Sequence, residues 1–299
     1  MLAVARDALR VERRGELVAV QWQAMASPCE LLVATRDLDL ARRLGEVAAG
    51  EAWRIEHKYS RYRDDSVIGA LNHSNGVPVA VDPETMLLLQ FAARCHELSD
   101  GAFDITSGVL RRAWRFDGGA RMPDAVQIEA LRTRIGFDRL RFEESALIVP
   151  PGMELDFGGI GKEYAVDCAL ALVLREFDGA MLVNFGGDIA ANHQPDSGPW
   201  KVGVERPDAH GAARLLLDFG RGGLATSGDT HRFFEHGGKR YGHILDVRSG
   251  YPVEGAPRSV TVAAACCLEA GMMATLAMLQ GAGAEEFLAA QGVPNWCLR

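Results

Sequence analysis

The spacing of apolar residues along the chain predicts many strands and a few long helices. Apolar residues recur at helical spacing over residues 36–57, 85–98 and 165–176, and residues 268–280 are apolar on every helical face, which indicates a buried helix. Strands are predicted by short apolar or alternating runs at residues 17–21, 30–35, 147–149, 153–157, 180–183, 200–205, 214–219 and 258–265. Strands outnumber helices and do not alternate regularly with them, so the pattern favours an α+β fold.

One stretch in the last quarter of the chain concentrates polar and turn-forming residues. Two alternating runs, at residues 232–235 and 240–246, flank a His-Gly-Gly turn and predict a β-hairpin. The hairpin would bring the Ser-Gly-Asp turn at residues 227–229 towards His243 and Asp246. Each residue alone has an ordinary alternative as a hydrogen-bonding histidine, a turn or a surface ion pair. Their density makes the group a candidate site.

Three glycine-containing turns are further candidates for a binding site. Residues 158–161 and Lys162 precede a predicted helix, where free amides, the helix dipole and the lysine favour a phosphate group. Close packing of the helix on a strand explains the same glycines equally well. Residues 184–189 form a second glycine turn with a polar rim. Residues 101–108 suit either a close approach to a ligand or a solvent-facing turn.

An aromatic and basic segment lies between the first two long helices. Tyrosines and arginines alternate over residues 59–63, which indicates either a wall that stacks on a planar ring or amphipathic packing. Ser66 follows two aspartates and is expected to cap a short helix that reaches Asn72.

Composition and charge restrict the partners and the compartment. The net charge of −8 argues against nucleic acid as the main partner, because such binding normally needs a basic surface. No apolar run reaches the roughly 20 residues of a membrane-spanning helix, and the opening segment is charged where a signal peptide would be apolar. We therefore expect a cytoplasmic protein, or a periplasmic one if a leader has been removed.

The six cysteines predict no disulfide framework. None stands at Cys-x-x-Cys spacing, so they are expected to be small buried hydrophobic residues in a reducing compartment. The same spacing argues against a zinc site, since no pair of His or Cys residues stands at ligand distance along the chain.

Six motifs occur in order along the chain and together carry a resemblance to a known family. They are SRY at residues 60–62 with Asn72, GAFDIT at 101–106, LDFGGIGKEYAVD at 155–167, NFGGDI at 184–189, TSGD at 226–229 and HILDVRSGYPV at 243–253. With these motifs the chain resembles the ApbE family, the FAD:protein FMN transferases, over residues 25 to about 281. The resemblance implies an α+β fold of mixed sheets with packed helices and a flavin in a central cleft. It also implies a single domain over residues 1–299 in which the first ~24 residues are peripheral.

The resemblance implies an enzyme that binds FAD and uses magnesium on its pyrophosphate. It would move the FMN half onto a Thr or Ser hydroxyl of a target flavoprotein and release AMP. By position, His243 is expected near the role of the base that accepts the hydroxyl proton. Gly159, through its backbone oxygen, and Thr275 are expected to bind the metal. The residues expected to bind FAD are Met25, Tyr62, Ala102, Phe103, Asp104, Asp156, Lys162, Ser227 and Ile244.

The expected metal motif departs from the family pattern. The family normally carries Asp four residues before the threonine, and here Gly271 stands in that place, while Thr275 is kept. Glu269 lies on a different helical face and is not expected to substitute. Glu163 replaces a usual glycine after the lysine, and its carboxylate would either repel the ligand or help to hold a displaced metal.

Three functions therefore remain open at the level of sequence. The first is a flavin transferase with weakened or relocated magnesium binding, and the second is an ApbE-like protein that binds or carries FAD with little or no transfer. The third is a hydrolase that uses Ser227, His243 and Asp246. It is disfavoured because no nucleophile elbow surrounds the serine.

Overall fold

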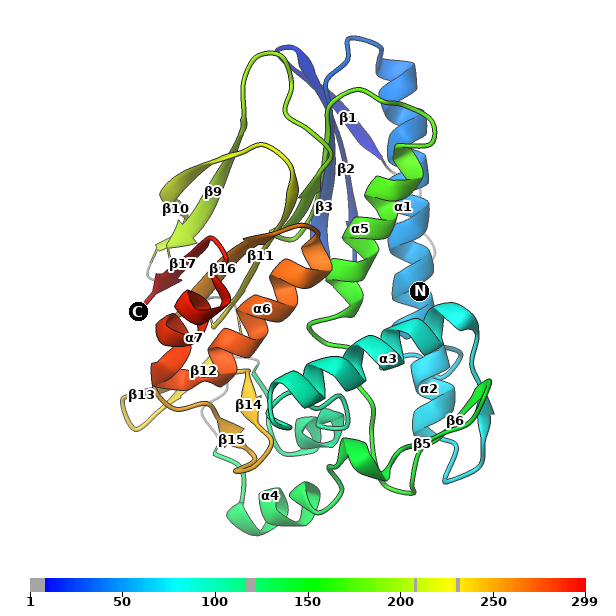
Figure 1. Ribbon diagram of the computed structural model, residues 1–299, viewed down its shortest axis with the longest axis vertical. Coiled ribbons are helices and arrows are strands. Elements are labelled where there is room, and N and C mark those ends of the chain that lie inside the picture. The colour runs from blue at the N-terminus through cyan, green and yellow to red at the C-terminus, as the bar shows by residue number, and fades with distance from the viewer. Residues whose placement is uncertain (1–8, 117–121, 207–208, 230–231) are drawn as a thin grey trace.

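The computed structural model describes residues 9–116, 122–206, 209–229 and 232–299 (Figure 1). Its largest element is an eight-stranded sheet in the order β1-β2-β3-β7-β8-β11-β16-β17, in which every neighbouring pair is antiparallel. The strands are β1 (Arg10–Arg14), β2 (Leu17–Ala24), β3 (Ser27–Val33), β7 (Met181–Phe185), β8 (Asp188–Ala191), β11 (Gly222–Gly228), β16 (Ser259–Ala264) and β17 (Asn295–Leu298). Together with the helices described next, this sheet confirms the α+β class.

Three long helices cover one face of this sheet: α1 (Leu38–Tyr59), α5 (Gly161–Val173) and α6 (Cys267–Leu279) (Figure 1). Successive side chains of a strand point to opposite faces, so each strand can pack against the helices on one face and against other residues on the second face. In β3, Leu31 and Val33 are buried in the core beneath the helices, whereas Leu32 between them packs against the core on the other side of the sheet. The helix pattern of α6 is apolar almost all round because the helix is buried, as predicted.

A two-stranded ribbon, β9 (Trp200–Arg206) and β10 (Ala209–Phe219), covers part of the opposite face. Trp200 and Phe219 pack there against Leu182 of β7 and Leu224 of β11. The chain is thus layered, with helices, a sheet and then a ribbon, and apolar side chains fill both interfaces.

Most of the remaining elements gather at one end of the long helices, below them in Figure 1. They are α2 (Val67–Asn72), α3 (Pro83–Leu98), α4 (Ala125–Arg132), a small sheet of β4 (Val79–Ala80), β5 (Arg141–Phe142) and β6 (Ala146–Ile148), the pairs β12 (Phe233–His236) with β13 (Lys239–Gly242) and β14 (Leu245–Asp246) with β15 (Tyr251–Pro252), and the single turns η1 (Gly108–Arg112) and η2 (Phe137–Arg139). The turn η3 (Gly281–Gly283) follows α6, and α7 (Ala284–Gln291) lies beside α6 and β17 (Figure 1). In the described part of the chain, none of the helices has the length and apolar character needed to cross a membrane.

Local side-chain chemistry sets the helix boundaries. Ser66 caps α2 as predicted, with its Oγ accepting from the backbone N–H of Gly69 at 2.8 Å. At α6 the cap comes from another helix, because the two oxygens of Asp167 in α5 accept from the N–H groups of Cys267 and Leu268, each at 2.9 Å. This double hydrogen bond fixes the start of α6 against α5.

The predicted hairpin is present, with a two-residue turn at Gly237 and Gly238, both at positive φ. Its second strand, however, ends at Gly242 instead of continuing to residue 246. The strand predicted at residues 153–157 is wrong. Only Glu154 forms a one-residue bridge there, because the backbone N–H and C=O of Leu155 pair with the side chain of Asn72.

The N-terminal segment is placed more centrally than the sequence predicted. Residues 1–24 were expected to be peripheral, but β2 lies between β1 and β3 in the main sheet. Val18 and Val20 on β2 are fully buried against the helices. The short alternating run thus contributes to the core, while residues 1–8 lie outside the described residues.

Candidate active site

A cavity of about 2180 Å³ opens where the glycine turns, the 101–106 loop and the segment after the hairpin meet. It lies at the edge between the main sheet and the lower group of elements. All twelve residues expected at the site line it: Met25, Tyr62, Ala102, Phe103, Asp104, Asp156, Gly159, Lys162, Ser227, His243, Ile244 and Thr275. Ten of them come from five of the six motifs, Met25 and Thr275 lie outside the motifs, and the sixth motif reaches the same cavity through Asn184, Gly186 and Asp188.

The turn between β2 and β3 forms one rim of the cavity with unusual backbone geometry. Met25 and Ala26 both adopt positive φ, at 51° and 54°, although neither is glycine. The turn between β7 and β8 approaches it closely. A Cβ on Gly186 would lie 2.7 Å from the Cβ of Ser27, so only glycine fits there.

The loop at residues 101–106 is held rigidly against the cavity by Asp104. One carboxylate oxygen accepts from the backbone N–H and the hydroxyl of Thr106, both at 2.7 Å, and the other accepts from the N–H of Phe137 at 2.9 Å. Phe103 and Ala102 are buried and form the adjoining wall. Asp104 thus fixes the backbone of the wall, and Ala102 and Phe103 supply apolar surface to the cavity.

The tyrosine and arginine segment divides into a core residue and a rim residue. Tyr59 is buried, with its ring beside Phe157, whereas Tyr62 is 75% exposed and lies beneath the guanidinium of Arg61. Arg61 also pairs with Asp156. The packing alternative is therefore confirmed for Tyr59, whereas Tyr62 and Arg61 line the cavity and the stacking of a planar ring there stays a prediction.

The first turn of α5 carries Lys162, one of the cationic residues that line the cavity. Nζ of Lys162 lies 2.6 Å from a carboxylate oxygen of Asp188, which is almost fully buried on β8. Burial opposes the charge on the lysine, but the Asp188 and Glu163 carboxylates outweigh it and raise the pKa of Lys162 above its usual range. Burial also raises the pKa of Asp188, against the opposing effect of Lys162.

The two expected metal ligands are neighbours in space. A Cβ placed on Gly159, whose φ is +81°, would lie 3.6 Å from Oγ1 of Thr275. The Thr275 hydroxyl forms a hydrogen bond with Ser227 at 2.9 Å. Glu163 lines the same cavity and is buried, and burial together with the Asp188 charge raises the pKa of its carboxyl to about 7.

His243 reaches the cavity from the segment that follows the hairpin. Its ring lies edge-on to Phe116, with centroids 6.3 Å apart, and its Nδ1 is buried without a hydrogen-bond partner in the described part of the chain. Burial, assisted by the charge of Arg232, lowers the pKa of His243 to about 4. The imidazole is therefore neutral at neutral pH and has a nitrogen available to accept a proton.

The arrangement required for a serine hydrolase is not formed. The Ser227 hydroxyl pairs with Thr275, and Asp246 accepts from the backbone and side chain of Arg248. Because neither residue is bonded to His243, the three side chains do not form a relay.

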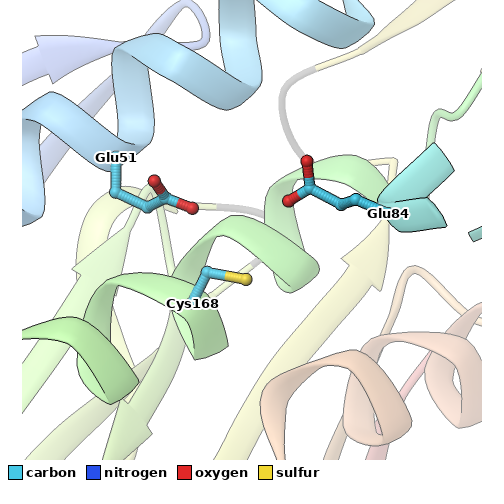
Figure 2. A group of neighbouring side chains, drawn as sticks. All are labelled: Glu51, Glu84 and Cys168. Atoms are coloured by element: carbon cyan, nitrogen blue, oxygen red, sulfur yellow. The ribbon is translucent and has the colours of Figure 1, made fainter. Parts of the chain in front are cut away.

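A separate group of metal-ligand types, Glu51, Glu84 and Cys168, lies where α1, α3 and α5 meet (Figure 2). The carboxylates are already neutralised, because Arg54 donates to Glu51 at 2.7 and 2.8 Å and to Glu84 at 2.6 and 2.8 Å. Burial raises the pKa of the Cys168 thiol to about 11, so it stays protonated at neutral pH. We interpret this group as a structural link between three helices.

The ApbE family profile matches residues 25–295. The chain belongs to the ApbE family. The FAD:protein FMN transferase of Klebsiella pneumoniae strain 342 is 33% identical over 272 residues, which are 89% of this chain and 83% of the relative. The enzyme of the same name from Vibrio cholerae is 32% identical over 235 residues, or 76% and 70% of the two chains.

Solved structures of ApbE proteins share the fold. The ApbE protein of Thermotoga maritima superposes with a TM-score of 0.85 at 29% identity and covers 94% of both chains. The flavin transferase ApbE of Vibrio cholerae gives a TM-score of 0.81 at 26% identity, with 96% of this chain and 94% of that chain covered. The layered architecture described above is therefore that of the ApbE family.

Asp188 and Glu163 also line the cavity, although neither was predicted as a site residue from the sequence. Asp188 occurs in the NFGGDI motif, but only the structure shows its ion pair with Lys162. Glu163 was expected, as a departure from the family pattern, to place a carboxylate beside the phosphate site. The available sequence signal for Asp188 was an acidic residue directly after a glycine turn.

Proposed function

We propose that this protein is a FAD:protein FMN transferase. It breaks the bond between the FMN phosphorus and the bridging oxygen of FAD, joins that phosphorus to a Thr or Ser hydroxyl of an acceptor flavoprotein, and releases AMP. The observation that carries the proposal is the convergence of all twelve expected site residues on one cavity. The names of relatives that cover most of this chain support the same activity.

The walls of the cavity suit the parts of FAD. Met25, Phe103 and Ile244 supply apolar surface for a planar ring. Lys162 and the amides at the start of α5 favour the negative diphosphate. Because Asp188 forms an ion pair with Lys162, the ammonium group is positioned before the substrate binds.

The residues near Thr275 fit a magnesium ion, which prefers oxygen ligands. The Thr275 hydroxyl and the backbone carbonyl of Gly159 would contribute to holding it, and their adjacency is the structural basis for this assignment. When bound, magnesium would neutralise charge on the diphosphate oxygens. Ser227 fixes the hydroxyl of Thr275 by its 2.9 Å hydrogen bond.

His243 would take the proton from the acceptor hydroxyl. Its imidazole is neutral, its Nδ1 is unpartnered in the described part of the chain, and it lines the cavity. A neutral imidazole in the cavity wall can accept the proton of a hydroxyl group that comes within hydrogen-bond distance of it. The apolar setting beside Phe116 keeps competing protonation low.

The test is to incubate the protein with FAD and Mg²⁺, with and without a flavoprotein subunit that carries a Thr or Ser flavinylation site. AMP is measured by chromatography and covalent flavin by in-gel fluorescence. We expect both products in equal amounts with the wild-type chain. The His243→Asn variant should still bind FAD, but its rate of product formation should be lower by about 100-fold or more. Bound FAD with no product in the wild type would instead support a FAD-binding or carrier protein.

A further inference from the structure

Glu163, in the first turn of α5, is a buried carboxylate with an unsatisfied oxygen. Its residue is only 6% exposed, and Oε2 has no hydrogen-bond partner in the described ranges. An unpaired buried polar atom destabilises the fold, and more so when the group is charged. A carboxylate of this kind at the wall of a cavity is typical of a site that a ligand completes.

Gly271, in α6, makes the room that Glu163 occupies. A Cβ on Gly271 would lie 2.5 Å from Cγ and 3.0 Å from Oε1 of Glu163, closer than real side chains approach. The two positions therefore form a matched pair, in which a carboxylate from α5 fills the space where a side chain from α6 would otherwise project.

The carboxylate lies on the same side of α6 as Thr275. Residues four apart share a helix face, so Thr275 follows Gly271 on the face that Glu163 contacts. Thr275 in turn adjoins Gly159, and all three of Glu163, Thr275 and Gly159 line the cavity. Nζ of Lys162 pairs with Asp188 at 2.6 Å, and among the described residues no salt bridge joins Lys162 to Glu163.

We propose that Glu163 supplies the charged ligand of the divalent cation in this protein, from α5, beside the Thr275 hydroxyl and the Gly159 carbonyl of the same cavity wall. The inference rests on the proposed function, because the cation would act on the diphosphate of FAD. It explains why a glycine at position 271 is compatible with a metal site. Carboxylate, hydroxyl and carbonyl oxygens form the hard ligand set that Mg²⁺ and Mn²⁺ prefer.

The experiment uses Mn²⁺ as the probe on the full chain with FAD present, and free Mn²⁺ is counted by electron paramagnetic resonance. Glu163→Gln keeps the shape of the side chain and removes its charge, and we expect it to weaken Mn²⁺ binding by about tenfold or more. The matched control is Glu269→Gln, which removes an exposed carboxylate two residues from Gly271 and should leave the Mn²⁺ affinity unchanged. Wild-type Mn²⁺ affinity in Glu163→Gln would overturn the proposal.

A second pair of variants keeps the test decisive if Glu163→Gln folds poorly. Gly271→Asp alone should crowd Glu163, lower the melting temperature and weaken Mn²⁺ binding. Adding Glu163→Gly to Gly271→Asp removes the crowding and returns a carboxylate to the site from α6, so both properties should recover. A double variant that binds Mn²⁺ no better than Gly271→Asp alone would contradict the proposal.

FAD titration of the wild type separates failure of this proposal from failure of the proposed function. Flavin fluorescence reports FAD binding without reference to the metal. If the wild type binds FAD and releases AMP while Glu163→Gln keeps full Mn²⁺ affinity, only the role of Glu163 is rejected. If the wild type neither binds FAD nor releases AMP, the proposed function is rejected.

Discussion

Single residues in the cavity show chemistry set by their surroundings. His243 is kept neutral by burial, Lys162 is kept charged by Asp188, and the carboxyl of Glu163 is buried beside Gly271. None of these environments is visible in the sequence, because each depends on residues from distant segments. The sequence could nevertheless nominate His243 and Lys162, because the resemblance rests on short motifs that contain them, and Thr275, because it is kept from the family's metal motif.

The depressed pKa of His243 predicts a pH dependence of stability. The unfolded chain binds a proton on this histidine below about pH 6.5, whereas the folded chain does so only near pH 4. The stability contribution is therefore fully present above pH 6.5 and is lost as the pH falls towards 4. At pH 5 the free energy of unfolding should be about 2 kcal/mol lower than at neutral pH because of this histidine.

Urea unfolding of the wild type and of His243→Asn at pH 7 and at pH 5 measures this contribution. The wild type should lose more stability than the variant between the two pH values, and the difference isolates the histidine from other titrating groups. Equal losses in the two proteins would show that His243 titrates normally in the folded state.

Ala26 offers a second test at the residue scale. Its φ of 54° costs an L-residue with a Cβ roughly 1 kcal/mol relative to glycine, and its side chain is exposed, so no packing opposes a change. We expect Ala26→Gly to raise the free energy of unfolding by about 0.5–1 kcal/mol in urea titrations. Lower stability in this variant would mean that the turn between β2 and β3 does not hold the left-handed geometry in solution.

Elements were predicted well where a local pattern decides them. The long helices, the hairpin turn at Gly237 and Gly238 and the Ser66 cap follow from periodicity and turn chemistry. The strand at residues 153–157 was wrong because Asn72, far away in sequence, provides the backbone partners of Leu155. A partner of that kind is a tertiary contact and leaves no trace in the alternation of residues.

The cap that Asp167 provides for α6 gives a prediction at the element scale. Asp167→Ala should lower the free energy of unfolding by about 1–2 kcal/mol, because two helix N–H groups lose their acceptor. It should also weaken Mn²⁺ binding, since α5 and α6 carry Glu163 and Thr275. Asp124→Ala removes the cap of the distant α4 and serves as the control. If both variants leave Mn²⁺ affinity unchanged, the α5–α6 link does not position the metal site.

At the scale of the whole molecule, the fold brings six motifs to one edge of a layered α+β structure. The α+β fold class could be predicted by counting the expected strands and helices, and the family could be predicted from the motifs and their order. The strand order β1-β2-β3-β7-β8-β11-β16-β17 did not follow, because pairings such as β3 with β7 join segments about 150 residues apart. The resemblance nominated all twelve residues, but only tertiary structure shows that they share a cavity.

The mass of an acceptor flavoprotein subunit, taken after incubation with this protein, FAD and Mg²⁺, distinguishes FMN transfer from FAD binding alone. We expect the subunit to gain one covalently bound FMN at a Thr or Ser and an equal amount of AMP to appear. An unchanged subunit mass and no AMP, in a sample where flavin fluorescence shows FAD bound to the protein, would contradict this expectation.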